Sequence, residues 1–313
     1  MHELSLMDDA PIREIRVRCE ATLASPEFVK IAQTADGLAL HAPEIAHLVA
    51  AAARGTIPSE RLLELARTYA QPGVPEGDFA VARFVLLTAG IPNLQRLPSL
   101  PVAAEVKHRL LDWFSYLCAP DREMAQLLNL SDYHFSLMCK LVRLERFPGR
   151  QIDWEISAFP RSWLAKVPFS DMPRLARCVF LRAGGNRPFF EAHTASRREL
   201  PILTEEEERK DYRLMALSMK LQPEIRGFFG SSWFADPELQ RVSPHLSWLA
   251  RWYEECADFG AVWTDTGEAS PDGGFLVGDR HRRRLYEQGL WKPKQGLLVW
   301  PRKDLLRWYE ATT

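Results

Sequence analysis

The chain has 313 residues, more than a single hydrophobic core usually holds, so its length favours two domains. Hydrophobic residues make up 46% and charged residues 26%, which are ordinary globular values that allow a substantial core. The formal net charge of -1 excludes a global attraction to nucleic acid or to an anionic membrane. A site for an anionic partner must therefore be local.

The cysteines and the N-terminus indicate where the protein resides. The 5 cysteines are odd in number and form no CxxC pair, which argues against a disulfide framework or a structural zinc site. The N-terminal sequence MHELSLMDDAPIREIRVRCE is charged and lacks the apolar segment of a signal peptide. No run of about eighteen apolar residues is present. We therefore expect a cytoplasmic protein with reduced thiols and no membrane partner; the sequence does not indicate an oligomeric state.

Residues 1–150 are predicted to form an α-helical domain. Several segments carry apolar residues at three- and four-residue spacing and are separated by proline and glycine. A further amphipathic helix follows a proline-bounded turn, and Pro148 with Gly149 makes a natural boundary. The predicted helical segments are 25–35, 42–53, 58–70, 78–90 and 97–119.

The stretch REMAQLLNLSDYHFSLMCKLVR, within residues 120–145, resembles a helix-turn-helix. Ala125 would lie where the helices cross, Asn129 and Ser131 at the turn, and Phe135 would anchor the second helix. Two packed helices without DNA need the same features. Asp132 in the first turn of the second helix would repel phosphate, so DNA binding is possible but not favoured.

Residues 151–313 are predicted to form a mixed α/β domain, because short β-rich runs alternate with helical patterns. The runs 178–184 and 188–194 surround the turn GGNRP and suggest a hairpin. Thr204 and Glu207 form a capping box at the start of a long helix. The later predicted elements are a strand at 225–233, a helix at 244–260, a strand at 261–264, a basic helix at 280–289, a strand at 296–302 and a terminal helix.

Glu191 and His193 are the first candidates for catalysis. They stand two residues apart at the end of a predicted strand, so their side chains share one face. A carboxylate beside an imidazole can orient it as a general base, or both can bind a metal ion. A half-buried polar pair bonded to the backbone is the alternative. A metal site would need a third ligand, for which the candidates are Glu155, Asp236 and His245.

The stretch GFFGSSWFADPEL begins as a buried strand and ends polar. Its glycines permit close approach of a ligand, and the hydroxyls of Ser231 and Ser232 can face that ligand. Trp233 would wall the ligand in or simply close the core. Asp236, in the Asp-Pro turn that follows, is a further substrate-binding candidate.

The basic helix carries the densest positive charge of the chain, at Arg280, Arg282, Arg283 and Arg284. Like charges this close repel one another unless an anion lies among them. A phosphorylated cofactor, a nucleic-acid backbone or acidic residues of the same protein would serve, and a solvated helix face is the alternative. Arg161, which follows a proline at the start of a short helix, is a candidate for an anionic group of the substrate.

Several long motifs resemble a family of uncharacterised bacterial proteins. They are SAFPRSWL, FFEAHT, IRGFFGSSWFADPELQRVSPHLSWL and RRRLYEQGLWKPKQGLLVWPR, and together they cover roughly residues 150–302. This resemblance implies no activity. An arginine is associated with the position of His245 in that family, which makes His245 a poor candidate for catalysis.

The order of predicted elements, together with LYEQGLW at residues 285–291, resembles the GNAT acyltransferase superfamily, in which a late helix often ends in LYEK-x-GF. The resemblance implies that acyl-CoA lies in a V-shaped cleft beside the central strand IRGFFGSSW, and that Tyr286 is a general acid. The Q/R-x-x-G-x-G/A loop that holds the CoA pyrophosphate in that superfamily is absent, since the corresponding helix begins LPILTEEEER. The acyl carrier is therefore either CoA or another carrier.

We expect the fold class α+β, with a helical N-terminal domain (1–150) followed by a GNAT-like mixed α/β domain (151–313). The expected function is transfer of an acyl group from a phosphorylated carrier, held by the basic helix, to an amine. Glu191 and His193 would remove the amine proton, Ser231 and Ser232 would donate hydrogen bonds to the acyl oxygen, and Tyr286 would protonate the leaving group.

Two other functions stay open. One is a non-catalytic regulator, in which the helix-turn-helix joins a ligand-sensing α/β domain. The other is a metal-dependent enzyme centred on Glu191 and His193. The favoured function needs a small-molecule substrate and an acyl carrier and no metal.

Overall fold

The computed structural model describes residues 9–25, 28, 35–67, 78–119, 132–194, 203–270 and 279–313. The chain folds into two compact units, which divide between Gly149 and Arg150. Each unit has a hydrophobic core of its own.

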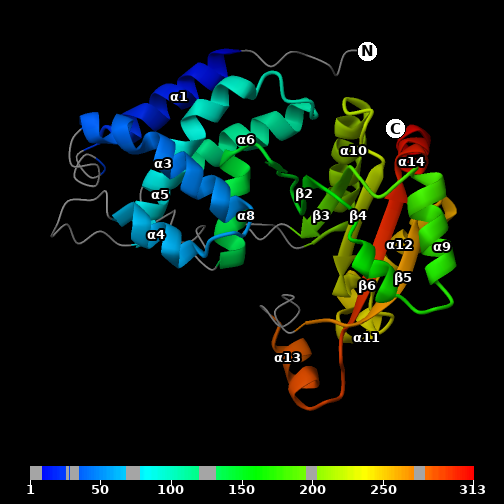
Figure 1. Ribbon diagram of the computed structural model, residues 1–313. Coiled ribbons are helices and arrows are strands. Elements are labelled where there is room, and N and C mark those ends of the chain that lie inside the picture. The colour runs from blue at the N-terminus through cyan, green and yellow to red at the C-terminus, as the bar shows by residue number, and fades with distance from the viewer. Residues whose placement is uncertain are drawn as a thin grey trace. The chain divides into compact units, whose positions relative to one another are not determined.

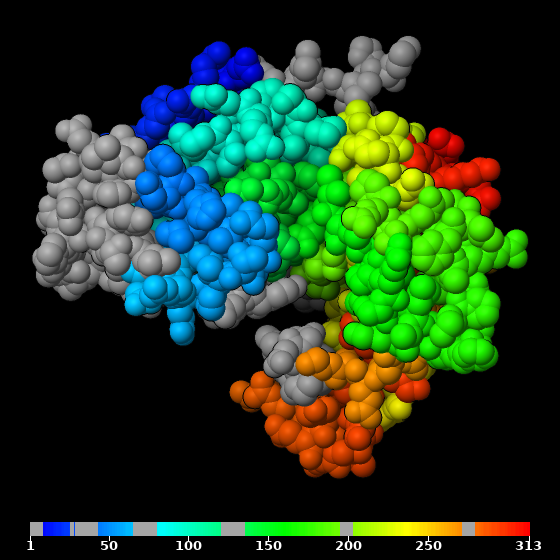
Figure 2. Space-filling view, in the orientation of Figure 1, coloured from blue at the N-terminus to red at the C-terminus, as the bar shows by residue number. Residues whose placement is uncertain are grey.

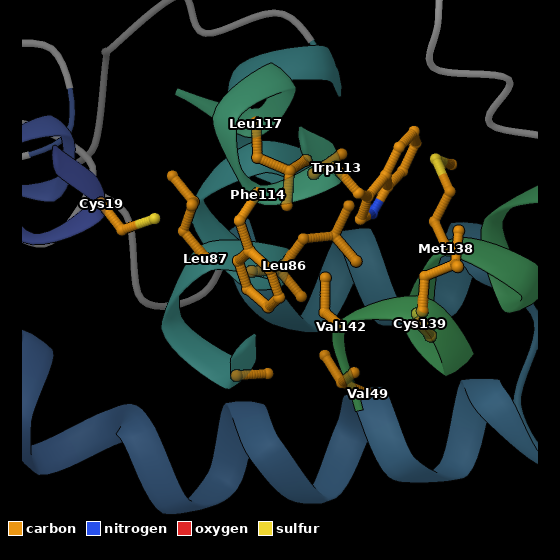
Figure 3. Close-up of a cluster of buried hydrophobic side chains, with 14 of the residues drawn as sticks. Cys19, Val49, Leu86, Leu87, Trp113, Phe114, Leu117, Met138, Cys139 and Val142 are labelled. Carbon is orange, nitrogen blue, oxygen red and sulfur yellow. The ribbon is translucent and has the colours of Figure 1, made fainter. Parts of the chain in front are cut away.

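The first unit is built from helices whose apolar faces meet in one core. In α6, for example, the buried residues include Leu110, Phe114 and Leu117, which recur at three- and four-residue spacing. Figure 3 shows Leu86, Phe114 and Val142 converging from different helices. The elements of this unit are α1 (Asp9–Leu23), α3 (Ala35–Ala53), α4 (Ser59–Arg67), α5 (Asp78–Gly90), η1 (Ile91–Arg96), α6 (Ala104–Leu117), α8 (Asp132–Val142) and the short strand β1 (Arg146–Phe147).

The predicted helix-turn-helix falls mostly outside the described residues. Its second helix corresponds to α8, but residues 120–131, with the first helix and the turn, are not described. Within α8, Phe135 and Met138 are buried in the core of the first unit. Among the described residues, no helix is long and apolar enough to cross a membrane.

The second unit is organised around a mixed sheet, in which the last strand of the chain lies between two earlier ones (Figure 1). The strands β2 to β6 follow the order β2-β3-β4-β6-β5, so β4 is central as predicted. β3 and β4 are parallel, and the other neighbours are antiparallel. The strands are β2 (Ile152–Ser157), β3 (Phe189–Thr194), β4 (Gly227–Ser232), β5 (Val262–Glu268) and β6 (Lys294–Pro301).

Helices cover both faces of this sheet. On one face Tyr212 of α10 stacks on Phe228 of β4 and on Trp252 of α12, with ring centroids 5.2 Å apart in both pairs. On the other face Phe229 of β4 packs edge-on against Phe159, at 5.4 Å. The first face carries α10 (Glu205–Lys220), α12 (Trp248–Asp258) and α14 (Arg302–Thr312), and the second carries η2 (Arg161–Ala165), α9 (Met172–Ala176) and η3 (Arg177–Arg182).

The predicted hairpin of residues 178–184 with 188–194 is wrong. Helix α9 continues into η3, which ends at Arg182, and β3 pairs with β2 instead. A short apolar run does not by itself distinguish a buried strand from a buried helix. Gly184 and Gly185 have φ of 79° and 137°, so these glycines follow the end of a helix and do not close a hairpin.

The predicted fold class is confirmed as far as the architecture goes: a helical first unit is followed by a mixed α/β unit. Half of the predicted capping box is present: Thr204 Oγ1 accepts a hydrogen bond from the Glu207 amide at 3.4 Å, whereas the Thr204 amide donates to Gln151 Oε1 and not to Glu207. The remaining elements of the second unit are η4 (Trp233–Ala235), α11 (Leu239–Val242), η5 (Pro244–Leu246) and α13 (Arg280–Glu287).

Candidate functional site

The two parallel strands of the second unit separate at their carboxyl ends. β3 and β4 pair up to Ala192 and Gly230, and no further pairing joins them in the described part of the sheet. Beyond that point His193 still pairs with β2 and Ser232 still pairs with β6. Each strand follows its outer neighbour, so an opening forms between the two ends.

A pocket that is partly open to solvent lies at this opening. The strand ends line it through His193, Ser231 and Ser232, and the helices α10 and α12 line it through Glu208 and Tyr253. We call it the strand-end pocket. A few polar groups within apolar walls are the composition typical of a ligand site. The aromatic residues of its walls include Tyr212, Phe228, Phe234 and Trp263.

Glu155, Glu191 and His193 form a polar group beside the opening. Glu155 lies opposite Glu191 in the β2–β3 register, and His193 Nε2 is 3.5 Å from Glu155 Oε1 and 3.9 Å from Glu191 Oε1. The ligand atoms of all three lie within 4.8 Å of one another. A carboxylate can orient the imidazole as a base, and the group can also hold a metal ion. Of the third ligands that the sequence suggested, the structure brings Glu155 to this group, and not Asp236 or His245.

Ser231 and Ser232 lie where β4 leaves β3. Ser231 Oγ accepts a hydrogen bond from Gln295 Nε2 at 2.5 Å, and Ser232 Oγ accepts one from the Phe234 amide at 3.2 Å. A hydroxyl also carries one donor. Because consecutive side chains of a strand point to opposite faces, the Ser232 hydroxyl lies on the face of Phe228 and α10, and the Ser231 hydroxyl lies on the face of Phe229. A Cβ at Gly230 would lie 3.3 Å from the Ala192 carbonyl oxygen, so glycine fits the point where the strands begin to separate.

Glu208 lines the strand-end pocket and was not among the predicted site residues. It is 6% exposed; its Oε1 accepts a hydrogen bond from the Tyr212 hydroxyl at 3.1 Å, and its Oε2 has no partner among the described residues. Burial raises the pKa of this carboxyl to about 8. A sequence signal existed, because Glu208 continues the buried stripe of Tyr212, Met215 and Met219 at helical spacing.

Tyr253 of α12 is the second residue that the sequence analysis missed. It lines the pocket, and its ring stacks on that of Trp263 with centroids 3.8 Å apart. Burial raises the pKa of Tyr253 well above its ordinary value, so the phenol stays protonated. Tyr286, the predicted acid, lies on α13 and is not among the described residues that line the pocket.

The arginines of α13 divide into one buried and three exposed residues. Arg282 is 8% exposed and donates to Ser243 Oγ at 2.9 Å, and its guanidinium pairs with Asp279 Oδ2 at 3.0 Å and lies over the Trp233 ring. These contacts fasten α13 to the second unit. The helix is on the surface of that unit in Figure 2, and its exposed arginines are Arg280, Arg283 and Arg284.

The three predicted substrate-binding residues lie apart from the pocket lining. Trp233 is buried and packs against Trp291 at a centroid distance of 6.4 Å. Asp236 is 5% exposed and accepts a hydrogen bond from the Trp291 indole. Arg161 is the exposed first residue of η2. The first two therefore stabilise the loop that follows β4.

Two solved structures resemble this chain over nearly its whole length. An acyltransferase in complex with decanoyl-CoA and teicoplanin is 15% identical, with a TM-score of 0.51 and coverage of 95% of this chain and 90% of that chain. An acyltransferase in complex with CoA and 10C-teicoplanin is 16% identical, with a TM-score of 0.51 and coverage of 93% and 88%. This chain has the fold of an acyltransferase. At this identity the likeness concerns the fold alone, and no protein-family model and no curated protein matches the chain.

Proposed function

We propose that this protein is an N-acyltransferase that moves an acyl group from the thioester of a phosphorylated carrier to an amine. The opening between β3 and β4 is the observation that carries the proposal, because it joins hydroxyl donors, an imidazole and a protonated phenol around one pocket. The acyltransferase fold supports the same reaction class. The bound acyl-CoA, CoA and teicoplanin of the two neighbours are consistent with a small-molecule donor and acceptor.

Each pocket residue has a place in this reaction. Ser232, on the face of the sheet that carries Tyr253, would donate a hydrogen bond to the thioester oxygen as it gains negative charge; the Ser231 hydroxyl, predicted to share this role, points to the opposite face. As the amine nitrogen bonds to the acyl carbon, His193, oriented by Glu155 and Glu191, would accept the proton that the nitrogen loses. The carbon–sulfur bond then breaks and the sulfur leaves as a thiolate.

The leaving thiolate needs a proton. Tyr253 would supply it, because its phenol is protonated and lines the pocket, and it takes the role that the sequence analysis gave to Tyr286. In this way the thiol and the amide are the products, and the proton taken by His193 replaces, through solvent, the one that Tyr253 gave, so that both residues return to their starting states.

The phosphorylated end of the carrier would lie near α13. Arg280, Arg283 and Arg284 are exposed there and can pair with phosphate oxygens. The first turn of α10 carries four glutamates, Glu205 to Glu208, which would repel a pyrophosphate. CoA and a phosphopantetheine-bearing protein both carry the acyl thioester at one end of a pantetheine arm and a phosphate at its other end, so either carrier fits.

Thermal unfolding with a panel of ligands tests the proposal. Acetyl-, octanoyl- or decanoyl-CoA at about 100 times its Kd should stabilise the protein by about 2.7 kcal/mol and raise its Tm. With an amine present, free thiol should appear. Replacing His193 by Gln should lower the rate of thiol release at least about 100-fold and leave the Tm increase unchanged.

His245→Gln is the matched control, because His245 is exposed and lies outside the pocket lining. It should leave the Tm increase and the thiol release as in the parent protein. If no acyl-CoA raises the Tm and no thiol is released with any amine, CoA is not the carrier. Acyl-phosphopantetheine proteins are then assayed in the same way, and a second negative result overturns the proposed function.

A metal-dependent enzyme is the second candidate, favoured by the closeness of Glu155, Glu191 and His193. Two carboxylates and one imidazole are ligands that Zn²⁺ and Mn²⁺ accept. Elemental analysis of the purified protein after dialysis against each ion should then find about one equivalent, and Glu155→Gln should lose it. An absence of stoichiometric metal in the parent protein after this loading would exclude the second candidate.

A further inference from the structure

Glu208 is a buried acid for which the proposed reaction has no use. Glu208 is more than nine-tenths buried, and yet it belongs to the lining of the strand-end pocket. Tyr212 satisfies Oε1, whereas Oε2 has no hydrogen-bond partner among the described residues. An unsatisfied buried carboxyl oxygen costs free energy, about 1 to 3 kcal/mol. Such a cost is tolerated in a site where a ligand supplies the missing partner.

The surroundings of Glu208 indicate which ligand would do so. Two stacked aromatic pairs stand beside it in the pocket, Tyr212 on Phe228 and Tyr253 on Trp263. The nearest arginine on the same helix, Arg209, is already paired with Glu205 at 2.9 Å and with Glu255 at 2.9 Å. Among the described residues that line the pocket there is no lysine or arginine. The pocket therefore offers an acid and aromatic faces, and it lacks a cation.

We propose that the strand-end pocket binds an organic ammonium group, a primary amine on an apolar or aromatic body, with Glu208 as its counter-ion. A carboxylate supplies the charge and the hydrogen-bond acceptor, and aromatic faces attract a cation and cover the apolar body. This amine would be the acyl acceptor once its ammonium group has passed one proton to the Glu208 carboxylate, which leaves the neutral amine as the nucleophile and Glu208 as the neutral acid. The inference therefore rests on the proposed function and names its substrate class. The amine would share the pocket with His193 and with the two serines of β4.

Binding of such a ligand must release a proton. The empty pocket holds Glu208 as the neutral acid at pH 7, and an ammonium group pairs with the ionised form. The affinity for an ammonium ligand should therefore rise about tenfold per pH unit from pH 6 to about pH 8, and level off above. The titratable or charged groups that face Glu208 or share its pocket are Glu205, Arg209, Asp211 and Tyr212 of α10, Tyr253 and Cys256 of α12, and His193 of β3.

Isothermal titration of the full chain with 2-phenylethylamine, without any acyl donor, tests the inference. The parent protein should bind this amine and should bind the neutral analogue 2-phenylethanol at least tenfold more weakly. Glu208→Gln keeps an acceptor for the Tyr212 hydroxyl and removes the charge. It should lower the affinity for the amine at least tenfold and abolish its rise between pH 6 and pH 8.

Glu206→Gln is the matched control. The Glu206 side chain is 78% exposed on the same helix, so this substitution removes the same charge outside the pocket. Unchanged affinity and pH dependence in this control are expected. The inference is overturned if the parent protein binds no amine, if 2-phenylethanol binds as well as the amine, or if Glu208→Gln leaves affinity and pH dependence unchanged. These titrations contain no acyl donor, so they test the amine site separately from acyl transfer. If the amine binds in a Glu208-dependent way but acyl-CoA has no effect, the inference is supported and the proposed function is not. If the protein transfers acyl groups but fails these titrations, the proposed function is supported and the inference is overturned.

Discussion

Asp236 and Trp291 connect two loops that are far apart in the sequence. The Asp236 carboxylate accepts a hydrogen bond from Trp291 Nε1 at 2.9 Å, and the same oxygen accepts one from the Lys294 amide at 3.0 Å. Its other oxygen accepts from the Glu238 amide at 2.8 Å. Both Asp236 and Trp291 are buried. This carboxylate therefore fixes the turn after β4 to the segment that leads into β6.

Replacing Asp236 by Ala should destabilise the second unit. The change leaves the buried Trp291 indole N–H and two backbone amides without their acceptor, so we expect a loss of about 3 kcal/mol in the free energy of unfolding. Urea unfolding followed by tryptophan fluorescence measures it. Asp236→Asn, which keeps one carbonyl acceptor, should lose less. Asp258→Ala, at an exposed position on α12, should change little; an equal loss in both alanine variants would contradict the assigned role.

Glu208 should make the stability of the protein depend on pH. In the unfolded chain this carboxyl ionises above about pH 4.3, whereas in the folded protein it keeps its proton up to about pH 8. The folded state thus holds one more proton between these values, and the free energy of unfolding falls as the pH rises through this window. By pH 7 the loss from this group is about 3 to 4 kcal/mol, from about 1.4 kcal/mol for each pH unit above about pH 4.3.

Glu208→Gln removes this dependence. The variant should be close to the parent protein in stability at about pH 4.5 and more stable by about 3 to 4 kcal/mol at pH 7, as measured by urea unfolding at both values. Glu206→Gln serves as the control and should show no such change, because Glu206 is exposed. A stability difference that is the same at both pH values would show that Glu208 ionises normally in the folded protein.

The sequence predicted those parts of the site that depend on local periodicity. A period of two places Glu191 and His193 on one face of β3, and the turn from apolar to polar residues in β4 marks the end of the central strand. The cap at Thr204 is likewise a local feature. Each of these depends on residues only a few positions apart.

Features that depend on distant partners were not predictable in this way. The strand β2 was not among the predicted elements. It is defined by its pairing with β3, which joins Glu155 to Glu191 across the helical segment between them. Glu208 was not distinguished from the other glutamates at the start of its helix, although its position on the buried stripe of α10 sets its environment. Arg282 was predicted to bind a phosphorylated carrier together with the other arginines of α13, yet it is buried and bonded to Ser243. Burial of a charged residue is decided by the packing of other elements, which local sequence does not encode.

Cys118 of the first unit should be an unusually reactive thiol. Its sulfur lies 3.4 Å from that of Cys19, and this contact lowers the pKa of Cys118 to about 7 while the pKa of Cys19 is raised. Because the thiolate is the nucleophile, iodoacetamide should modify Cys118 at a rate that reaches half of its maximum near pH 7. Mass spectrometry of the peptides measures this rate. Cys139 is the internal control, since burial raises its pKa and it should remain unmodified in the folded protein. Equal modification of both cysteines would contradict this prediction.

Arg282 and Arg283 are neighbours in α13, and their substitution by alanine should have different effects on the Tm. Arg282→Ala removes the hydrogen bond to Ser243 and the ion pair with Asp279, so it should lower the Tm. Arg283 is exposed, so Arg283→Ala should leave the Tm of the ligand-free protein unchanged.

If α13 holds the phosphorylated end of the carrier, Arg283→Ala should weaken acyl-CoA binding about tenfold at low salt, because a charge-assisted hydrogen bond contributes about 1.5 to 3 kcal/mol. Arg251→Ala, 76% exposed on α12, removes the same charge elsewhere and should bind acyl-CoA as the parent protein does. Equal acyl-CoA affinity of the Arg251 and Arg283 variants would place the phosphate of the carrier away from Arg283.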